Sequence, residues 1–298
     1  MAGGAARDAR LDFSLIDQIY GAIEIVRHNA AIIATGAAGT VFGAWLTSRS
    51  NFKRRIVDEL KALRAAYALC QTITMHVFNV KDQHIRRMKE AFDRAQIEFI
   101  IARWNRTPIS LTLNLNTLPE MNFPSERLLS TIFERCLVNM KCMTLAVQIN
   151  SSTEELRSSI KARNDLIDNY QKNTPETEAE RIQFYFGFPG PGTIDHRFRN
   201  NIDALSHQVD DCIIFSMMLG EELAKRYNSI FGRYHYRFRL GLNKMIPADW
   251  SEPQAKGLVP SRELWADWDE KFVFPPSRWQ RFQRAFNSGR LADWLEVY

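Results

Sequence analysis

Apolar side chains recur every three or four positions along three long stretches of the chain. The first stretch runs from Ile56 to Phe99, the second from Leu129 to Tyr170 and the third from Ile202 to Met245. This spacing places the apolar positions on one face of an α-helix. Residues 52–106 hold neither proline nor glycine. The first stretch is therefore predicted to be one helix of roughly 50 residues, and the third a helix of roughly 45 residues.

The stripe of apolar positions weakens or shifts at two places. In the first stretch, Lys81 and His84 occupy stripe positions. The second stretch begins at a clear helix-start signal, Pro124 followed by Ser125 as the cap, and its register shifts near Asn150 before the stripe resumes.

Proline-rich segments separate the three predicted helices. The first connection is bounded by Pro108, Pro119 and Pro124, and its LTLNLN run alternates like a short strand. We predict that this run forms an extended connection. The second connection starts at Thr174-Pro175 and contains FPGPG at residues 188–192, which ends any regular structure.

Three helices of similar length with bounded connections pack most simply in an up-down-up order. The expected fold class is therefore all-α, with a long antiparallel three-helix bundle in residues 49–245. Residues 246–298 differ, because they hold several prolines and five of the seven tryptophans. We expect an irregular, aromatic-rich C-terminal arm that docks its aromatic side chains on the bundle. The arm is predicted to end in an amphipathic helix from Ser277 to about Trp294.

The N-terminal part of the chain holds one long uncharged stretch. From Asn29 to Thr47, 19 residues carry no charge. As a helix they would be ~28 Å long, close to the ~30 Å hydrocarbon core of a bilayer. Trp45 lies near one end, where an interfacial aromatic is favoured. We therefore predict a transmembrane helix at 29–48, preceded by an amphipathic segment at 1–28. Because alanine, glycine and threonine contribute little insertion energy, a soluble helical hairpin is the alternative.

Small residues recur at every fourth position of this stretch: Ala31, Thr35, Gly39, Gly43 and Thr47. Gly39 and Gly43 form a GxxxG pair. In lipid, such a face lets a second helix backbone approach closely. It predicts a helix-association face, and with it a homo-oligomer formed through the transmembrane helix. A GxxxG pair that occurs by chance is the alternative.

Cations flank the uncharged stretch unequally. Three arginines precede it, whereas a denser basic run follows it: Arg49, Lys53, Arg54, Arg55, Lys61 and Arg64. The positive-inside rule then places the N-terminus outside and the C-terminal body in the cytoplasm. The expected location is therefore a membrane that the chain crosses once. The first four cations of the run adjoin the span and are predicted to contact anionic lipid.

Composition narrows the remaining chemistry. The 298 residues carry a net charge of +5, with a pI near 9.0. This mild basicity fits an anionic membrane surface or nucleic acid and selects neither. The four cysteines form no CxxC pair and offer no closely spaced zinc ligands. We expect reduced thiols, three of which fall on the apolar stripes.

The chain carries no Walker loop, GxGxxG, GxSxG or HExxH motif. Asp82 and His84 are two positions apart on a helix and do not face each other, and Asp195 before His196 suits a helix cap. Adjacent Asp210 and Asp211 point in different directions, with His207 nearby. We therefore expect no catalytic residues, metal or cofactor. An enzyme remains the third alternative, with a constellation of His207, Asp211 and arginines of the second helix.

The run from Arg233 to Arg239, RYHYRFR, alternates cations with aromatics, as nucleic-acid surfaces do. Tyr234 and Phe238 continue the apolar stripe of the third helix, however, so the arginines occupy its other faces. Nucleic acid is therefore not an expected partner.

The order of parts resembles a large, loosely related set of bacterial single-span proteins. The resemblance covers residues 28–230 and rests on the N-terminal helix, the basic stop at Arg49 to Arg55, and the ELxxL-like Glu59-Leu60-Lys61-Ala62-Leu63. Some of these proteins are associated with antiphage or toxin systems. The small-residue repeat and the absence of catalytic constellations predict a membrane-anchored oligomeric effector or scaffold, whose bundle would receive a cytosolic signal or protein partner. The resemblance implies that it acts at a bacterial inner membrane as a defence or toxin component. A soluble or peripheral regulatory binding module is the alternative.

Overall fold

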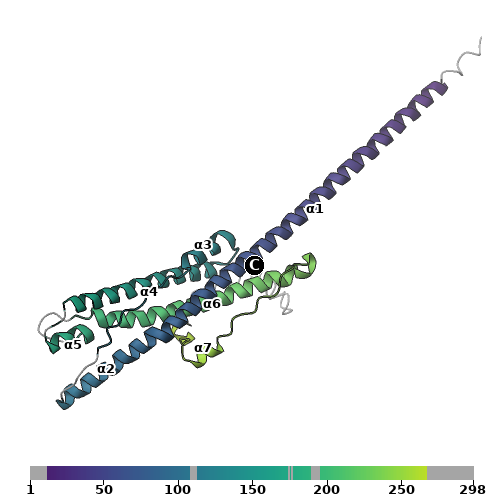
Figure 1. Cartoon of the computed structure of the whole chain (residues 1–298). Coiled ribbons are helices and arrows are strands. Elements are labelled where there is room, and N and C mark those ends of the chain that lie inside the picture. Colours follow the sequence, from purple (N-terminus) through teal and green to yellow (C-terminus); the bar gives the residue numbers. More distant parts are fainter. Residues whose placement is uncertain (1–11, 108–112, 174, 176, 189–194, 267–298) are drawn as a thin grey trace, which may run out of the picture. The chain divides into compact units, whose positions relative to one another are not determined.

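The computed structural model describes residues 12–107, 113–173, 175, 177–188 and 195–266 (Figure 1). Side chains are described for Gly21, Glu24 and most of these residues from Gly39 onward. Every element within these ranges is helical, which confirms the all-α prediction. The elements are α1 (Asp12–Val80), a π-helical turn (Lys81–Ile85), α2 (Arg86–Asn105), α3 (Ser125–Arg135), α4 (Met140–Lys172), α5 (Glu178–Phe186), α6 (Arg197–Phe238), α7 (Ser251–Ala255) and a 3-10 turn (Arg262–Trp265).

The chain divides into two compact units, residues 1–58 and 59–298. The second unit is a helical bundle, as predicted. Its core is built from the stripes seen in the sequence, with Leu63, Leu156 and Leu219 fully buried. The first predicted helix continues from α1 into α2 through the π-helical turn. The turn coincides with the weakened stripe, because its wider winding turns Ile85 into the core in place of His84.

The directions of the long helices differ from the predicted up-down-up order. Glu59 pairs with Arg226, and Lys89 with Asp203, so α1 and α2 run antiparallel to α6. The Lys141–Glu222 pair, together with the Asn201 amide that donates to Ser159 O, shows that α4 is also antiparallel to α6. The first and second long helices therefore run in the same direction, and the prediction that they are antiparallel is wrong.

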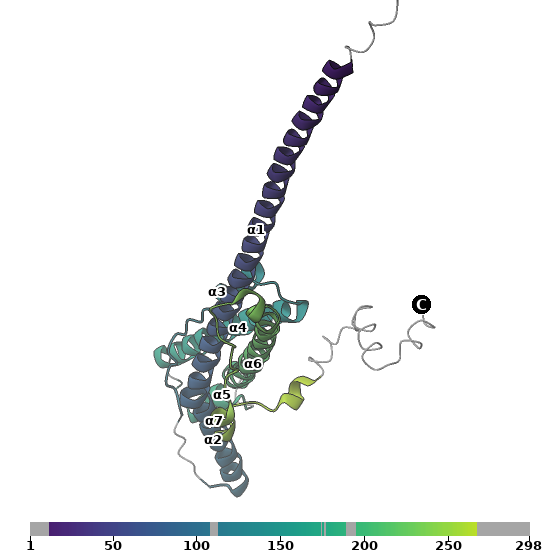
Figure 2. The same cartoon turned by 90° about the vertical axis from the view of Figure 1, so that its right-hand side faces the viewer.

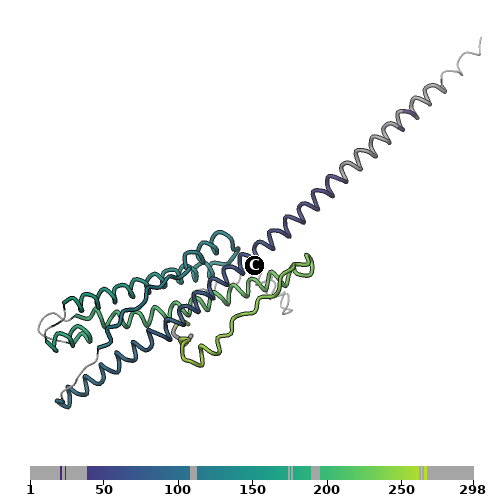
Figure 3. Tube along the Cα trace, in the orientation of Figure 1, coloured from purple at the N-terminus to yellow at the C-terminus, as the bar shows by residue number. Residues whose placement is uncertain are grey.

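The extended connection before α3 explains this arrangement, and Figure 3 shows its trace. Leu118 N–H donates to Asn164 Oδ1 at 2.9 Å, and Met121 O accepts from Arg157 Nε at 3.3 Å. Later residues of the connection thus meet earlier residues of α4. At ~3.3 Å per residue, residues 113–123 return about 36 Å along the 33-residue α4, which is ~50 Å long. The predicted extended connection is confirmed for its described residues.

The second predicted helix is divided in two, a break that the sequence pattern did not predict. Residues 136–139 separate α3 from α4, and the Asn139 side chain accepts from Cys142 N–H at 3.0 Å as the cap of α4. α4 then continues unbroken through Asn150, where the register shift was predicted.

All four cysteines are buried and free. Burial was predicted for Cys70, Cys136 and Cys212 from the apolar stripes, and Cys142 is buried in addition. Cys70 Sγ donates to Ser216 O at 2.9 Å across the contact between α1 and α6. Gly220 allows this close contact, since a Cβ atom there would lie 3.1 Å from Gln71 Nε2. Burial raises the pKa of the Cys70 and Cys142 thiols to about 12.

The described part of the C-terminal arm docks aromatic side chains on the bundle, as predicted. The Trp250 and Phe78 rings lie 5.7 Å apart, and Trp265 Nε1 donates to Asp211 Oδ1 at 3.0 Å. The arm reaches α2 where Arg86 donates to Lys256 O, and α7 and α2 appear next to each other in Figure 2. The predicted helix from Ser277 to about Trp294 lies outside the described residues.

Candidate functional site

Large apolar side chains are exposed on the described part of α1 in the first unit. Val41, Phe42, Trp45 and Leu46 are 70%, 60%, 51% and 47% exposed. The Phe42 and Trp45 rings stack at 5.9 Å, and the Arg49 guanidinium lies 5.3 Å from the Trp45 ring centre. A tryptophan between apolar and cationic side chains is the sequence of groups found where a helix leaves a bilayer.

All four cations predicted to contact lipid are exposed: Arg49, Lys53, Arg54 and Arg55. They lie within two turns of one another, directly after the exposed apolar group. Their spacing on one helix concentrates positive charge, which fits an anionic surface.

The small-residue face is open where it is described. A Cβ atom added at Gly39 or at Gly43 would meet nothing within 4 Å. Thr47 Oγ1 donates to Gly43 O at 2.9 Å, so its hydroxyl is satisfied within the helix. No contact with the described residues therefore requires glycine at either position. The side chains of Ala31 and Thr35, the other two members of the face, lie outside the described residues.

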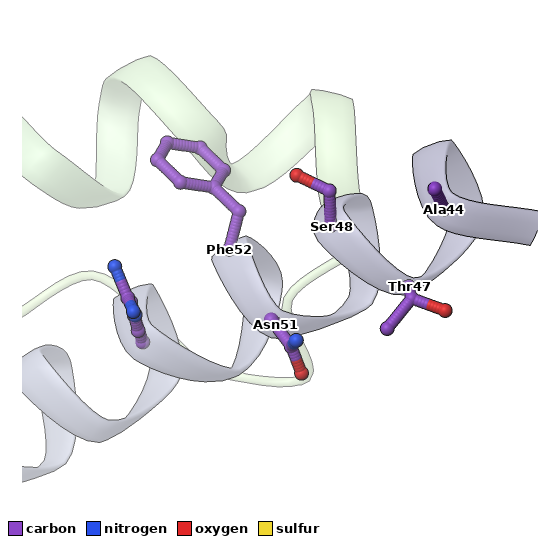
Figure 4. A pocket seen from close by; sticks show the side chains of 6 residues that line it. Ala44, Thr47, Ser48, Asn51 and Phe52 are labelled. Carbon is purple, nitrogen blue, oxygen red and sulfur yellow. The ribbon is translucent and has the colours of Figure 1, made fainter. Parts of the chain in front are cut away.

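Next to this face is a hollow of about 510 Å³ that the sequence did not indicate. Ser48 and Asn51 line it together with Ala44, Thr47, Phe52 and Arg55. Figure 4 shows Thr47 and Asn51 on one side of the helix, and Ser48 and Phe52 on the other. The hydroxyl and amide groups that line the hollow suit hydrogen bonding better than catalysis.

Within the described residues, no helix is both long enough and apolar enough to cross a membrane. Most of the predicted span, Asn29–Thr47, precedes Gly39 and so lies outside the described side chains.

The adjacent carboxylates of α6 bind separate partners. Asp210 Oδ1 lies 2.6 Å from Lys81 Nζ, and Lys81 also donates to Leu258 O of the arm. Asp211 accepts from Trp265, and burial raises its pKa, with the charge of Asp210 adding to the rise. Among the described residues, no three His, Cys, Asp or Glu side chains are placed to share a metal. The cluster thus docks the arm on the π-helical turn.

A buried arginine is the polar residue that the sequence analysis missed. Arg163 is 1% exposed, and its Nη1 donates to Asn116 O at 2.6 Å. Its guanidinium lies 5.7 Å from the Phe198 ring, and burial lowers its pKa to about 10. The available signal was its position three residues after Ile160 and four before Ile167, on the apolar stripe of α4.

The structure does not bring Arg163 to the polar cluster. Its neighbour Phe198 lies 13 residues before Asp211 on α6, or about 20 Å along the helix. The constellation considered for an enzyme, which combines His207 and Asp211 with arginines of the second helix, is not assembled around this arginine.

The remaining candidates have structural roles. Asp82 accepts from Arg86 one turn later. The N-cap of α6 is His196, not Asp195 as predicted, although the Asp195 side chain accepts from the Arg197 backbone N–H at 3.0 Å. In the RYHYRFR run, Phe238 is buried, whereas Tyr236 is 90% exposed.

Comparisons of the chain with protein-family models, with curated proteins and with solved structures gave no match. The interpretation of the site therefore rests on its own residues and their geometry.

Proposed function

We propose that this protein is a single-span, membrane-anchored helical protein that self-associates through α1. It would act at a bacterial inner membrane as an oligomeric effector or scaffold, in defence or as a toxin component. The observation that carries the proposal is the exposed run from Val41 to Leu46, followed directly by Arg49 and Lys53 to Arg55. Moving a large exposed apolar side chain into an apolar environment is worth ~1.5–3 kcal/mol, and a bilayer supplies that environment.

The open face at Gly39 and Gly43 supports self-association. Helices in lipid gain little from burying apolar side chains, so close backbone packing decides whether they associate. Among the described residues, nothing lies within 4 Å of a Cβ atom added at either of the two glycines, which are one turn apart, and this leaves room for a second copy of α1. The basic run after the span supports a cytoplasmic C-terminal body.

The test replaces the two glycines with leucine, Gly39→Leu/Gly43→Leu, in the full chain. We expect crosslinking between copies in membranes to fall and any toxicity on expression to fall with it, because leucine separates the two backbones. The matched control is Ala44→Leu/Ser48→Leu, which adds two leucines one turn apart at exposed positions on another side of the helix. Unchanged crosslinking in the glycine variant would refute the association face.

Alkaline-carbonate extraction tests the anchor separately. The full chain is expected to remain in the membrane pellet. Its release into the soluble fraction would remove the span and leave the alternative, a regulatory binding module.

That alternative has its own observation in the second unit. Ile97, Ile100, Ile101 and Trp104 form an exposed stripe on α2, and Trp104 is 88% exposed. Their spacing of three and four residues is that of a helix face that binds another helix. Under this alternative, Ile100→Ser/Trp104→Ser would abolish binding to a cytosolic partner and leave membrane association unchanged.

A further inference from the structure

We propose that the end of the second unit at which α6 terminates docks on the surface of an anionic lipid bilayer. The inference rests on the proposed function, since the membrane that holds the span would be the one that this end meets. It adds a second lipid contact, made by the helical body.

Three contacts define this end of the unit. Arg226 Nη2 lies 3.1 Å from a carboxylate oxygen of Glu59, the first residue of the unit. α6 continues from there for about three more turns to Phe238. The junction of α3 and α4 lies at the same end, since Lys141 of α4 approaches Glu222 at 3.7 Å and the charge of Glu59 acts on Cys136.

Positive charge is concentrated here. Between Glu222 and Asp249 the chain carries six cations and no acid. Four of these cations follow Ile230 and are exposed: Arg233, Arg237, Arg239 and Lys244. Within the described part of the chain, none of the four forms an ion pair. Each such cation near an anionic leaflet contributes about 1 kcal/mol of attraction.

Exposed apolar side chains accompany the cations. Tyr236 is 90% exposed on the last turns of α6, and Leu137 and Met140 are 71% and 61% exposed at the junction of α3 and α4. Phe133 is 51% exposed on α3. Side chains of this kind bury into the boundary between headgroups and acyl chains, while neighbouring arginines bind lipid phosphates.

These features favour lipid over nucleic acid. Base stacking needs several free aromatic faces. Of the tyrosines and the phenylalanine in the run from Arg233 to Arg239, Phe238 is buried and Tyr234 is half-buried, so that only Tyr236 is exposed. The aliphatic side chains of Leu137 and Met140 suit acyl chains better than bases. Chain connectivity agrees, because the 12 residues from Thr47 to Glu59 can extend no further than about 40 Å.

The experiment places an environment-sensitive NBD dye at Tyr236→Cys in the full chain. The four native cysteines are buried, so the dye attaches at position 236. The labelled protein is reconstituted in vesicles of phosphatidylcholine alone or of phosphatidylcholine with phosphatidylglycerol. We expect a blue-shifted, brighter emission only with phosphatidylglycerol. The shift should be lost as salt rises from about 0.1 M to about 1 M, where the Debye length falls from ~10 to ~3 Å.

The variant Arg233→Gln/Arg237→Gln/Arg239→Gln should lower the ratio of docked to undocked protein on the order of 100-fold, since three cations are removed. The matched control, Arg94→Gln/Arg103→Gln/Arg106→Gln, removes the same charge from exposed positions of α2 and its cap, and should keep the shift. The salt reversal is measured on the labelled Tyr236→Cys protein alone, so it tests docking even if the triple arginine variant misfolds.

The outcomes separate this inference from the proposed function. Resistance to alkaline carbonate without any phosphatidylglycerol-dependent shift would overturn the docking and leave the anchor intact. Extraction by carbonate with a persistent shift would support docking as peripheral binding and overturn the anchor. A shift produced by a single-stranded oligonucleotide, and not by phosphatidylglycerol, would overturn the lipid assignment in favour of nucleic acid.

Discussion

The buried Arg163 allows the sharpest prediction about stability. Burial lowers its pKa to about 10, well below the ordinary value of arginine, so keeping the guanidinium charged at neutral pH costs stability. At ~1.36 kcal/mol per unit of pKa, this cost is about 3 kcal/mol. A charge-assisted hydrogen bond from Arg163 to Asn116 O, worth ~1.5–3 kcal/mol, offsets this cost of burial. Arg163 Nε is buried with no partner among the described residues and adds to the cost.

The cost of burying the Arg163 charge and the gain from its hydrogen bond nearly cancel. Because methionine fills much of the same space without a charge, Arg163→Met should change the free energy of unfolding by no more than about 2 kcal/mol. Arg163→Ala also leaves a cavity beside Phe198, and should cost about 3–5 kcal/mol. The measurement is urea unfolding of the full chain in detergent micelles, followed by tryptophan fluorescence. A methionine variant as unstable as the alanine variant would refute the reasoning, since the polar contacts of Arg163 would then outweigh its burial.

The contribution of Arg163 to the free energy of unfolding depends on pH in a definite direction. Because the folded-state pKa of Arg163 is about 10 and lies below the unfolded value, the unfolded chain binds more protons at pH values between the two. The contribution of Arg163 to stability should therefore rise with pH in that window and be flat below it. The difference in unfolding free energy between wild type and Arg163→Met should shift in favour of wild type above pH 10.

Three further predictions concern the second unit. Gly220→Ala should change the free energy of unfolding by less than about 1 kcal/mol, because the flexible amide of Gln71 can move and alanine favours the helix. Gly220→Leu should cost more than about 2 kcal/mol, because the larger side chain overpacks the contact with α1. The urea midpoints of the two variants distinguish these outcomes. Asp211→Asn should be more stable than wild type at pH 7, since burial and Asp210 raise the pKa of Asp211 while the amide oxygen still accepts from Trp265. The raised pKa penalises only the ionised carboxylate, so this gain in stability should shrink as the pH falls through the folded-state pKa. An equal gain at pH 7 and at pH 4 would contradict this. The four buried cysteine thiols should resist an aromatic disulfide reagent at pH 8 until the chain unfolds, because burial raises the pKa of each of them; rapid labelling of the folded protein would show that the bundle opens.

The helices were predictable from the sequence because period and burial coincide along them. The stripe positions Leu63, Leu156 and Leu219 are all fully buried. Prolines mark the connection before α3, but none marks the break at residues 136–139. The direction of α4 was not predictable. It depends on hydrogen bonds between the connection and distant side chains such as Asn164 and Arg157, which no local pattern records.

For the candidate site, exposure of the basic run at Arg49 and Lys53 to Arg55 followed from its charge. The exposed Tyr236 and the buried Arg163 did not follow from residue type, because each contradicts the usual preference of its side chain. Such reversals depend on what packs against a helix face. That is a property of the whole bundle.

The π-helical turn shows how one local irregularity connects several of these features. A regular α-helix through Lys81–Ile85 would keep polar Lys81 and His84 on the core stripe. The wider turn buries Ile85 and leaves Lys81 at the edge of the core, where it reaches Asp210 and Leu258 O together. The same turn thus preserves the core and attaches the C-terminal arm to it. Lys81→Met should consequently loosen the arm, seen as faster amide hydrogen exchange at residues 250–258, while exchange in the cores of α4 and α6 stays slow. Equal acceleration throughout the bundle would instead show that Lys81 stabilises the core itself.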